Sequence, residues 1–79
     1  MNKEELKLRM EMKMVQLKNL MNHLLYDHVS DYDNCLRDGF VKQEELRNAI
    51  IDYKQAGATD EDIQDAWRVF YKFQTTLGD

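Results

Sequence analysis

Apolar residues recur with helical spacing along the first third of the chain. No glycine or proline occurs before Gly39, and Asn2 can cap a helix start by accepting the free amide hydrogens of the first turn. Successive apolar positions are separated by alternating steps of four and three residues, which places them in one narrow seam. The seam consists of Met10, Met14, Leu17, Met21, Leu24 and His28. This pattern predicts one helix over residues 3–29.

The N-terminal half of this helix is apolar on a second face. Leu8, Met12 and Val15 recur at i, i+4 and i+7, on roughly the opposite side from the seam. A helix of this length spans roughly 40 Å, about twice the length of either later helix. We therefore expect its first half to overhang the fold and contact a second copy or another protein; a helix bent near Lys18 and Asn19 is the alternative. The predicted interface is Leu6, Leu8, Met10, Met12, Met14 and Val15.

Two further apolar stripes follow in the second half of the chain. Leu46, Ala49, Ile50 and Tyr53 form the first, and Ile63, Ala66, Trp67 and Phe70 form the second. They predict helices over residues 42–56 and 60–74, joined by a short loop that contains Gly57. A short helical turn is expected at 31–37, within the connecting segment 30–40, and Asp38 and Gly39 would end this turn. No alternating pattern indicates a strand, so the predicted fold is a single all-α domain, with a long N-terminal helix packed on a C-terminal helical hairpin.

Length and charge narrow the class of protein. A chain of 79 residues is near the size at which a fold is marginal alone, and dimerisation would relieve this. Charged residues, 33% of the chain, interrupt the apolar positions, so we expect no membrane span, no signal peptide and a cytoplasmic location. The net charge of −4 is concentrated after residue 30. An acidic patch of Asp52, Asp60, Glu61, Asp62 and Asp65 could bind a basic groove of a partner, or could serve only solubility and helix capping.

One segment has the pattern of a metal site. Residues 34–45 resemble the calcium loop of the EF-hand family, with Asn34, Asp38 and Glu45 as oxygen ligands and Gly39 at the sharp turn. Leu36 occupies a place where the family has another oxygen ligand. The resemblance implies a degenerate calcium-binding module. The competing interpretation is a capped turn between helices, and we expect no metal and no cofactor.

Catalysis and nucleic-acid binding find little support. The single cysteine, Cys35, excludes a thiolate cluster within one chain, and no nucleophile has a base beside it, so an enzyme is not expected. The last two predicted helices faintly resemble a helix-turn-helix, but acids open the second one, where phosphates would lie. Cations of the first helix could bind nucleic acid, yet acids interleave with them. Those cations are Lys3, Lys7, Arg9, Lys13 and Lys18, and the acids are Glu4, Glu5 and Glu11.

The remaining class is a protein that acts by binding other proteins. A short, acidic, helical chain of this kind resembles the accessory proteins encoded by bacteriophages. We therefore predict a small regulatory protein that forms a homodimer through its first helix and binds, or inhibits, a partner protein. A calcium-binding module and a small helical nucleic-acid-binding protein are the alternatives.

Overall fold

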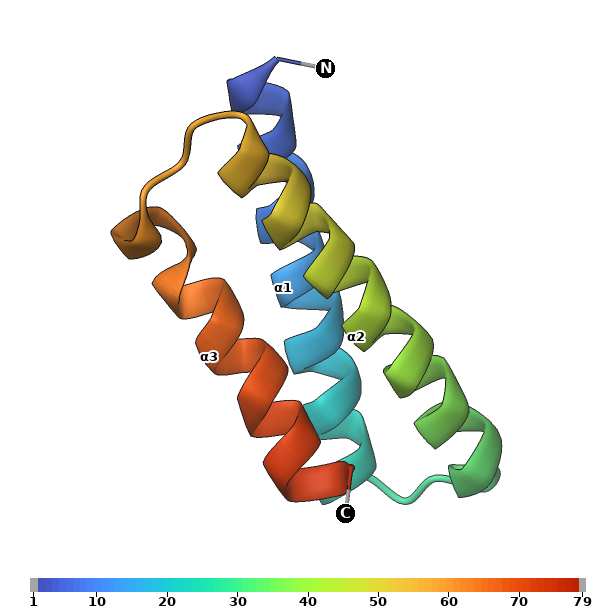
Figure 1. Cartoon of the computed structure of the whole chain (residues 1–79). Helices are drawn as coiled ribbons and strands as arrows, with labels where there is room; N and C mark the ends of the chain where they lie inside the picture. The colour runs from blue at the N-terminus through green and yellow to red at the C-terminus, as the bar shows by residue number, and fades with distance from the viewer. Residues whose placement is uncertain (1, 79) are drawn as a thin grey trace.

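Three helices account for most of residues 2–78, the part of the chain that the computed structural model describes (Figure 1). They are α1 (Lys3–Tyr26), α2 (Tyr32–Gln55) and α3 (Asp60–Leu77). The described residues contain no strand, which confirms the all-α prediction. α1 and α3 run in one direction and α2 runs in the opposite direction, and each helix contacts the other two. The fold is a three-helix bundle.

The start of each helix is set by a polar cap. The Asn2 side chain accepts a hydrogen bond from the backbone N–H of Glu5 at 2.8 Å, and the Asp31 side chain caps α2. Thr59 and Asp62 form a reciprocal capping box at the start of α3, with each side chain accepting from the backbone N–H of the other. These caps satisfy backbone donors that would otherwise lack a partner within the helix.

The core lies along the common axis of the three helices. Phe73, Leu17, Leu46 and Ile50 are its largest fully buried side chains. The α1 seam faces this core, since Met10, Leu17, Met21 and Leu24 are buried. His28, the predicted end of the seam, lies outside the helix and is exposed. The full set of packed core residues is Leu6, Met10, Leu17, Met21, Leu46, Ala49, Ile50, Tyr53, Ala58, Ile63, Ala66 and Phe73.

α2 differs from the helix that the sequence predicts. It begins at Tyr32 and continues through Gly39, where the sequence pattern indicates a break before a helix starting at residue 42. Among the described residues only Gly57 has a positive φ, of 109°, so Gly39 keeps an ordinary helical backbone. A Cβ atom on Gly39 would lie 2.7 Å from Cζ of Phe73. This glycine therefore permits close packing of α3 on α2 and does not end a helix.

The longer α2 removes the expected overhang of α1. Both helices have 24 residues and span about 36 Å, so α2 covers the N-terminal half of α1 as well as its C-terminal half. α1 ends at Tyr26 and not at residue 29, because the chain must leave the helix before Asp31, whose non-helical backbone caps α2. α3 continues to Leu77, three residues beyond the predicted end.

Candidate interaction surface

An exposed apolar stripe runs along the outer face of α1. Leu8, Met12 and Val15 are 54%, 62% and 55% exposed, and their i, i+4, i+7 spacing places them side by side on the helix. We call these three residues the α1 stripe. Part of it borders a surface depression of about 460 Å³, which Glu5, Arg9 and Lys13 also line. Scattered apolar residues are usual on protein surfaces, but a contiguous row on one face is typical of an interaction site.

The six residues predicted as an interface separate into two groups. Leu6 and Met10 are buried in the core of the chain itself, and Met14 is half-buried against that core. Leu6 and Met10 cannot reach a partner while the bundle is intact. The other three form the α1 stripe. The structure therefore reduces the candidate interface to the face of α1 that points away from α2 and α3.

Two ion pairs join α1 to α2 beside the stripe. Nη1 of Arg9 lies 3.0 Å from Oδ2 of Asp52, and Nζ of Lys13 lies 2.7 Å from Oε2 of Glu45. The hydrogen bond from Lys13 lowers the pKa of Glu45 below its ordinary value of 4.5, and the positive charge of Lys13 acts in the same direction. These contacts engage two of the five α1 cations that were considered for nucleic-acid binding. The remaining cations do not form a continuous basic row.

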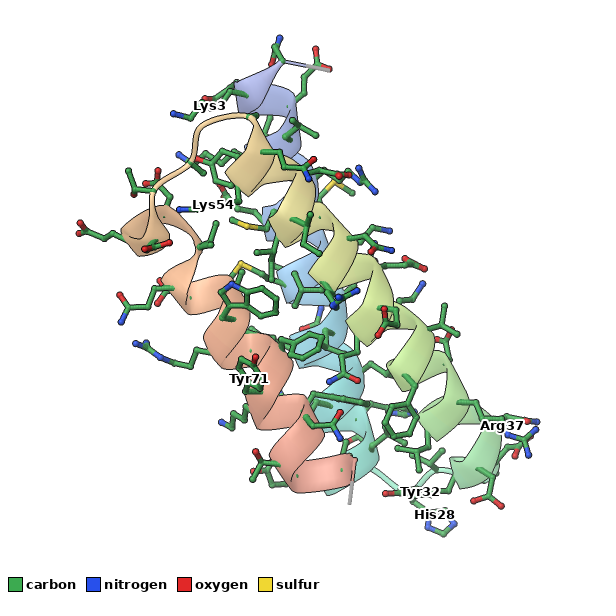
Figure 2. The ribbon with its side chains drawn as sticks, in the orientation of Figure 1. Lys3, His28, Tyr32, Arg37, Lys54 and Tyr71 are labelled. Atoms are coloured by element: carbon green, nitrogen blue, oxygen red, sulfur yellow. The ribbon has the colours of Figure 1, made fainter. Side chains whose placement is uncertain are left out.

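The predicted acidic patch is largely engaged within the molecule. Asp52 pairs with α1, Asp60 accepts a hydrogen bond from Nζ of Lys54 at 2.7 Å, and Asp65 lies 3.3 Å from Nη1 of Arg68. Figure 2 shows Lys54 beside the start of α3. The Lys54 hydrogen bond and charge lower the pKa of Asp60.

Asp62 also has a structural role. Its side chain accepts the backbone N–H of Thr59 at 2.9 Å. This hydrogen bond is the main cause of the lowered pKa of Asp62, and the Thr59 hydroxyl group contributes next. Glu61, the remaining member of the predicted patch, is exposed in the first turn of α3. Most of the acidic residues thus stabilise helix ends and helix contacts.

The calcium-loop interpretation does not match the backbone. Asn34, Asp38 and Glu45 all lie within the continuous helix α2, so the loop that would wrap around an ion is not formed. Glu45 instead binds Lys13. Among the described residues, no three or more His, Cys, Asp or Glu side chains are grouped so that they could hold a metal ion. The order of residue types in this segment was compatible with a loop, and the sequence pattern alone could not distinguish a loop from the continuous helix.

An aromatic cluster on α3 reaches the surface of the bundle, which the sequence did not predict. Trp67 stacks on Tyr71 with ring centroids 5.7 Å apart, and Phe70 meets both rings edge-on. Tyr71 is 58% exposed and lies on the outer surface of α3 in Figure 2. Trp67 also lines a depression of about 650 Å³ together with Asp60, Glu61, Ile63 and Gln64. In the sequence these aromatic residues look like a widened core stripe. Trp67 and Phe70 are half-buried against the core, and Tyr71 is exposed.

Comparisons with known proteins do not indicate a function for these surfaces. No family model, curated protein or solved structure matches the chain. Within residues 2–78, none of the three helices has the length and apolar character needed to cross a membrane. The fold defines a three-helix bundle, and the interpretation of its function rests on the surfaces described above.

Proposed function

We propose that this chain is a small cytoplasmic protein that forms a homodimer through the α1 stripe and regulates a partner protein by binding it. The supporting observation is the row of Leu8, Met12 and Val15 on the face of α1 opposite the core. The core is already filled by other residues, so folding of one chain leaves this row in water. Covering it would remove apolar surface from solvent, at roughly 25 cal/mol for each Å².

A second copy is a suitable occupant because the stripe is self-complementary. In an antiparallel pair of α1 helices related by a two-fold axis, Leu8 of one copy lies opposite Val15 of the other, and the two Met12 side chains meet near the axis. Apolar contact along the whole row supports this arrangement.

In the proposed dimer each chain keeps its own core. The chain exposes 5254 Å², close to the surface of about 5,000 Å² expected for a folded monomer of this mass. The proposed dimer is therefore an association of folded monomers, with an affinity that depends on concentration. Methionine at the centre suits such a contact, because its unbranched side chain adapts to different packing.

Partner binding is assigned to the N-terminal half of α3. Trp67, Glu61 and Gln64 line the depression of about 650 Å³ there, beside the exposed ring of Tyr71. Aromatic residues carry much of the binding energy at many interfaces, and an acidic border favours a basic partner. The proposed regulatory or inhibitory action would come from this face, which the α1 pairing leaves uncovered.

The dimer is tested by measuring mass in solution at several concentrations by light scattering. We expect the mass to approach twice 9.5 kDa at high concentration and to fall on dilution. Val15→Glu should hold the protein at the monomer mass, because it places a charge within the stripe. Val41→Glu is the matched control, since Val41 is also a helical valine with 55% exposure but lies on α2. A monomer at every concentration, or equal effects of the two variants, would refute the proposed interface.

The partner-binding face is tested separately by affinity capture with immobilised protein. Glu61→Lys should abolish retention of a specific partner, whereas Glu44→Lys, an exposed charge reversal on α2, should retain it. Retention that is insensitive to Glu61→Lys would remove the acidic end of α3 from the proposal.

A further inference from the structure

A third surface depression lies between the C-terminal halves of α1 and α3. It has a volume of about 300 Å³, and its lining is basic and apolar with no acidic residue. We call it the basic depression. Three cations line it in a chain whose net charge is −4. Its residues are Lys18, Met21 and Asn22 of α1, and Arg68, Val69 and Lys72 of α3.

Helical spacing on both sides produces this arrangement. Lys18 and Asn22 are one turn apart on α1, and Arg68 and Lys72 are one turn apart on α3. The two helices run in the same direction, and polar residues of both helices line the depression. Met21 is buried, and with the half-buried Val69 it provides an apolar floor.

The cations of the depression are weakly compensated within the chain. Arg68 approaches Asp65 at 3.3 Å, but both side chains are largely exposed, and such pairs contribute little. Lys18 and Lys72 take part in none of the ion pairs among the described residues. By contrast, Arg9 and Lys13 on the other flank of α1 are matched by carboxylates of α2. The depression is therefore a place where an added anion would neutralise repelling positive charges.

We propose that the basic depression binds a small phosphate monoester whose organic group is apolar. A phosphate monoester carries about two negative charges at neutral pH and offers three acceptor oxygens, which suits two lysines and one arginine. Its organic group would rest on Met21 and Val69, and Asn22 would donate a hydrogen bond from its amide. The volume is at the lower end of the range for ligand pockets, which favours a compact ligand with one ring or a short chain. This inference does not depend on the proposed dimer.

The test is a titration of the intact protein with phenyl phosphate, followed through backbone amide chemical shifts by NMR at pH 7.5. We expect saturable shifts concentrated in residues 18–22 and 68–72. Lys18→Gln and Lys72→Gln should each weaken binding by about two- to fivefold, as expected for the loss of one exposed charge contact. Lys3→Gln is the matched control, because Lys3 is an exposed lysine on the same helix about 22 Å from Lys18. It should leave binding unchanged.

Two further ligands and one change of pH separate the contributions of charge and apolar contact. Inorganic phosphate should bind more weakly than phenyl phosphate, and phenol should produce no saturable shifts. Lowering the pH to 5 should weaken binding, since the second phosphate pKa is near 6. Shifts that do not saturate, that spread over the whole bundle, or that are equally affected by Lys3→Gln and Lys72→Gln would overturn the proposal. Equal binding of the two phosphates would exclude the role of the apolar floor.

Discussion

Replacement of Gly39 by alanine adds one Cβ atom, which has two opposing effects on the stability of the fold. Gly39 lies inside α2, where alanine is favoured over glycine by about 1 kcal/mol in helix propensity. The added Cβ would lie 2.7 Å from Cζ and 2.9 Å from Cε2 of Phe73, whereas carbon atoms in good contact are about 3.5–4.0 Å apart. The ring or the helix must therefore move by roughly 1 Å.

Phe73 has little freedom to move away. Its side chain is fully buried, and its ring meets Phe40 edge-on with centroids 5.4 Å apart. Overpacking of this kind costs about 1–3 kcal/mol, which exceeds the gain in propensity. We expect Gly39→Ala to destabilise the protein by about 1 kcal/mol and to lower Tm by roughly 4–8 °C in thermal unfolding followed by circular dichroism.

A double-mutant cycle with Phe73→Leu isolates the steric effect. Shortening Phe73 removes the two ring atoms that the new Cβ would meet, so in that background Gly39→Ala should stabilise the helix by about 1 kcal/mol. Gly57→Ala is the control: Gly57 has φ of 109° and no atom within 4 Å of its Cβ position. Its cost comes from backbone strain and should be the same in both backgrounds. A stabilising Gly39→Ala in the wild-type chain, or no change of sign with Phe73→Leu, would refute the reasoning.

Three further changes test other parts of the bundle. Gln43→Leu should lower the free energy of unfolding in urea by about 1–2 kcal/mol. The buried Gln43 amide donates a hydrogen bond to the Phe70 carbonyl at 3.3 Å, and the substitution removes this donor. An unchanged urea midpoint would contradict this. Thr59→Ala should lower the free energy of unfolding by about 1 kcal/mol because it removes the α3 cap, whereas Thr59→Ser should leave stability nearly unchanged. Equal melting temperatures for the two variants would argue against the capping role. Acid should destabilise the fold, because the pKa values of Glu45 and Asp62 are lowered from 4.5 and 3.8. The contribution of these two carboxylates to the stability of the folded state is complete above about pH 4.5, and it is lost as the pH falls through their folded-state pKa values. Melting temperatures measured from pH 7 to pH 2 that stay constant would show that these carboxylates do not stabilise the native state.

Local signals in the sequence predicted the three helical regions of this protein and two of its caps, but they did not predict the start of α2 or the end of α1. Asn2 and Thr59 initiate α1 and α3 as expected, because a cap depends on residues within one turn of the chain. The buried side of α1 also follows from its apolar spacing, since 3.6-residue periodicity determines which side chains share a face. The exposed second face of α1 was visible for the same reason.

The tertiary structure decided the roles of residues whose partners are distant in sequence. Gly39 has the local pattern of a helix end, but Phe73, 34 residues later, requires its missing side chain inside a continuous helix. The C-terminal half of α2 packs on the N-terminal half of α1, as the ion pairs Arg9–Asp52 and Lys13–Glu45 show. Leu6 and Met10, predicted to contact a partner, are therefore buried in the core of the chain itself.

The pairing of surface charges and the surface depressions could likewise not be predicted from the sequence. Arg9 and Lys13 are neutralised by α2, while Lys18 and Lys72 come together from separate helices to line one depression. Periodicity gives the direction of each side chain around its own helix axis. It contains no information on which neighbouring helix covers that face, because that depends on packing between segments that are far apart along the chain.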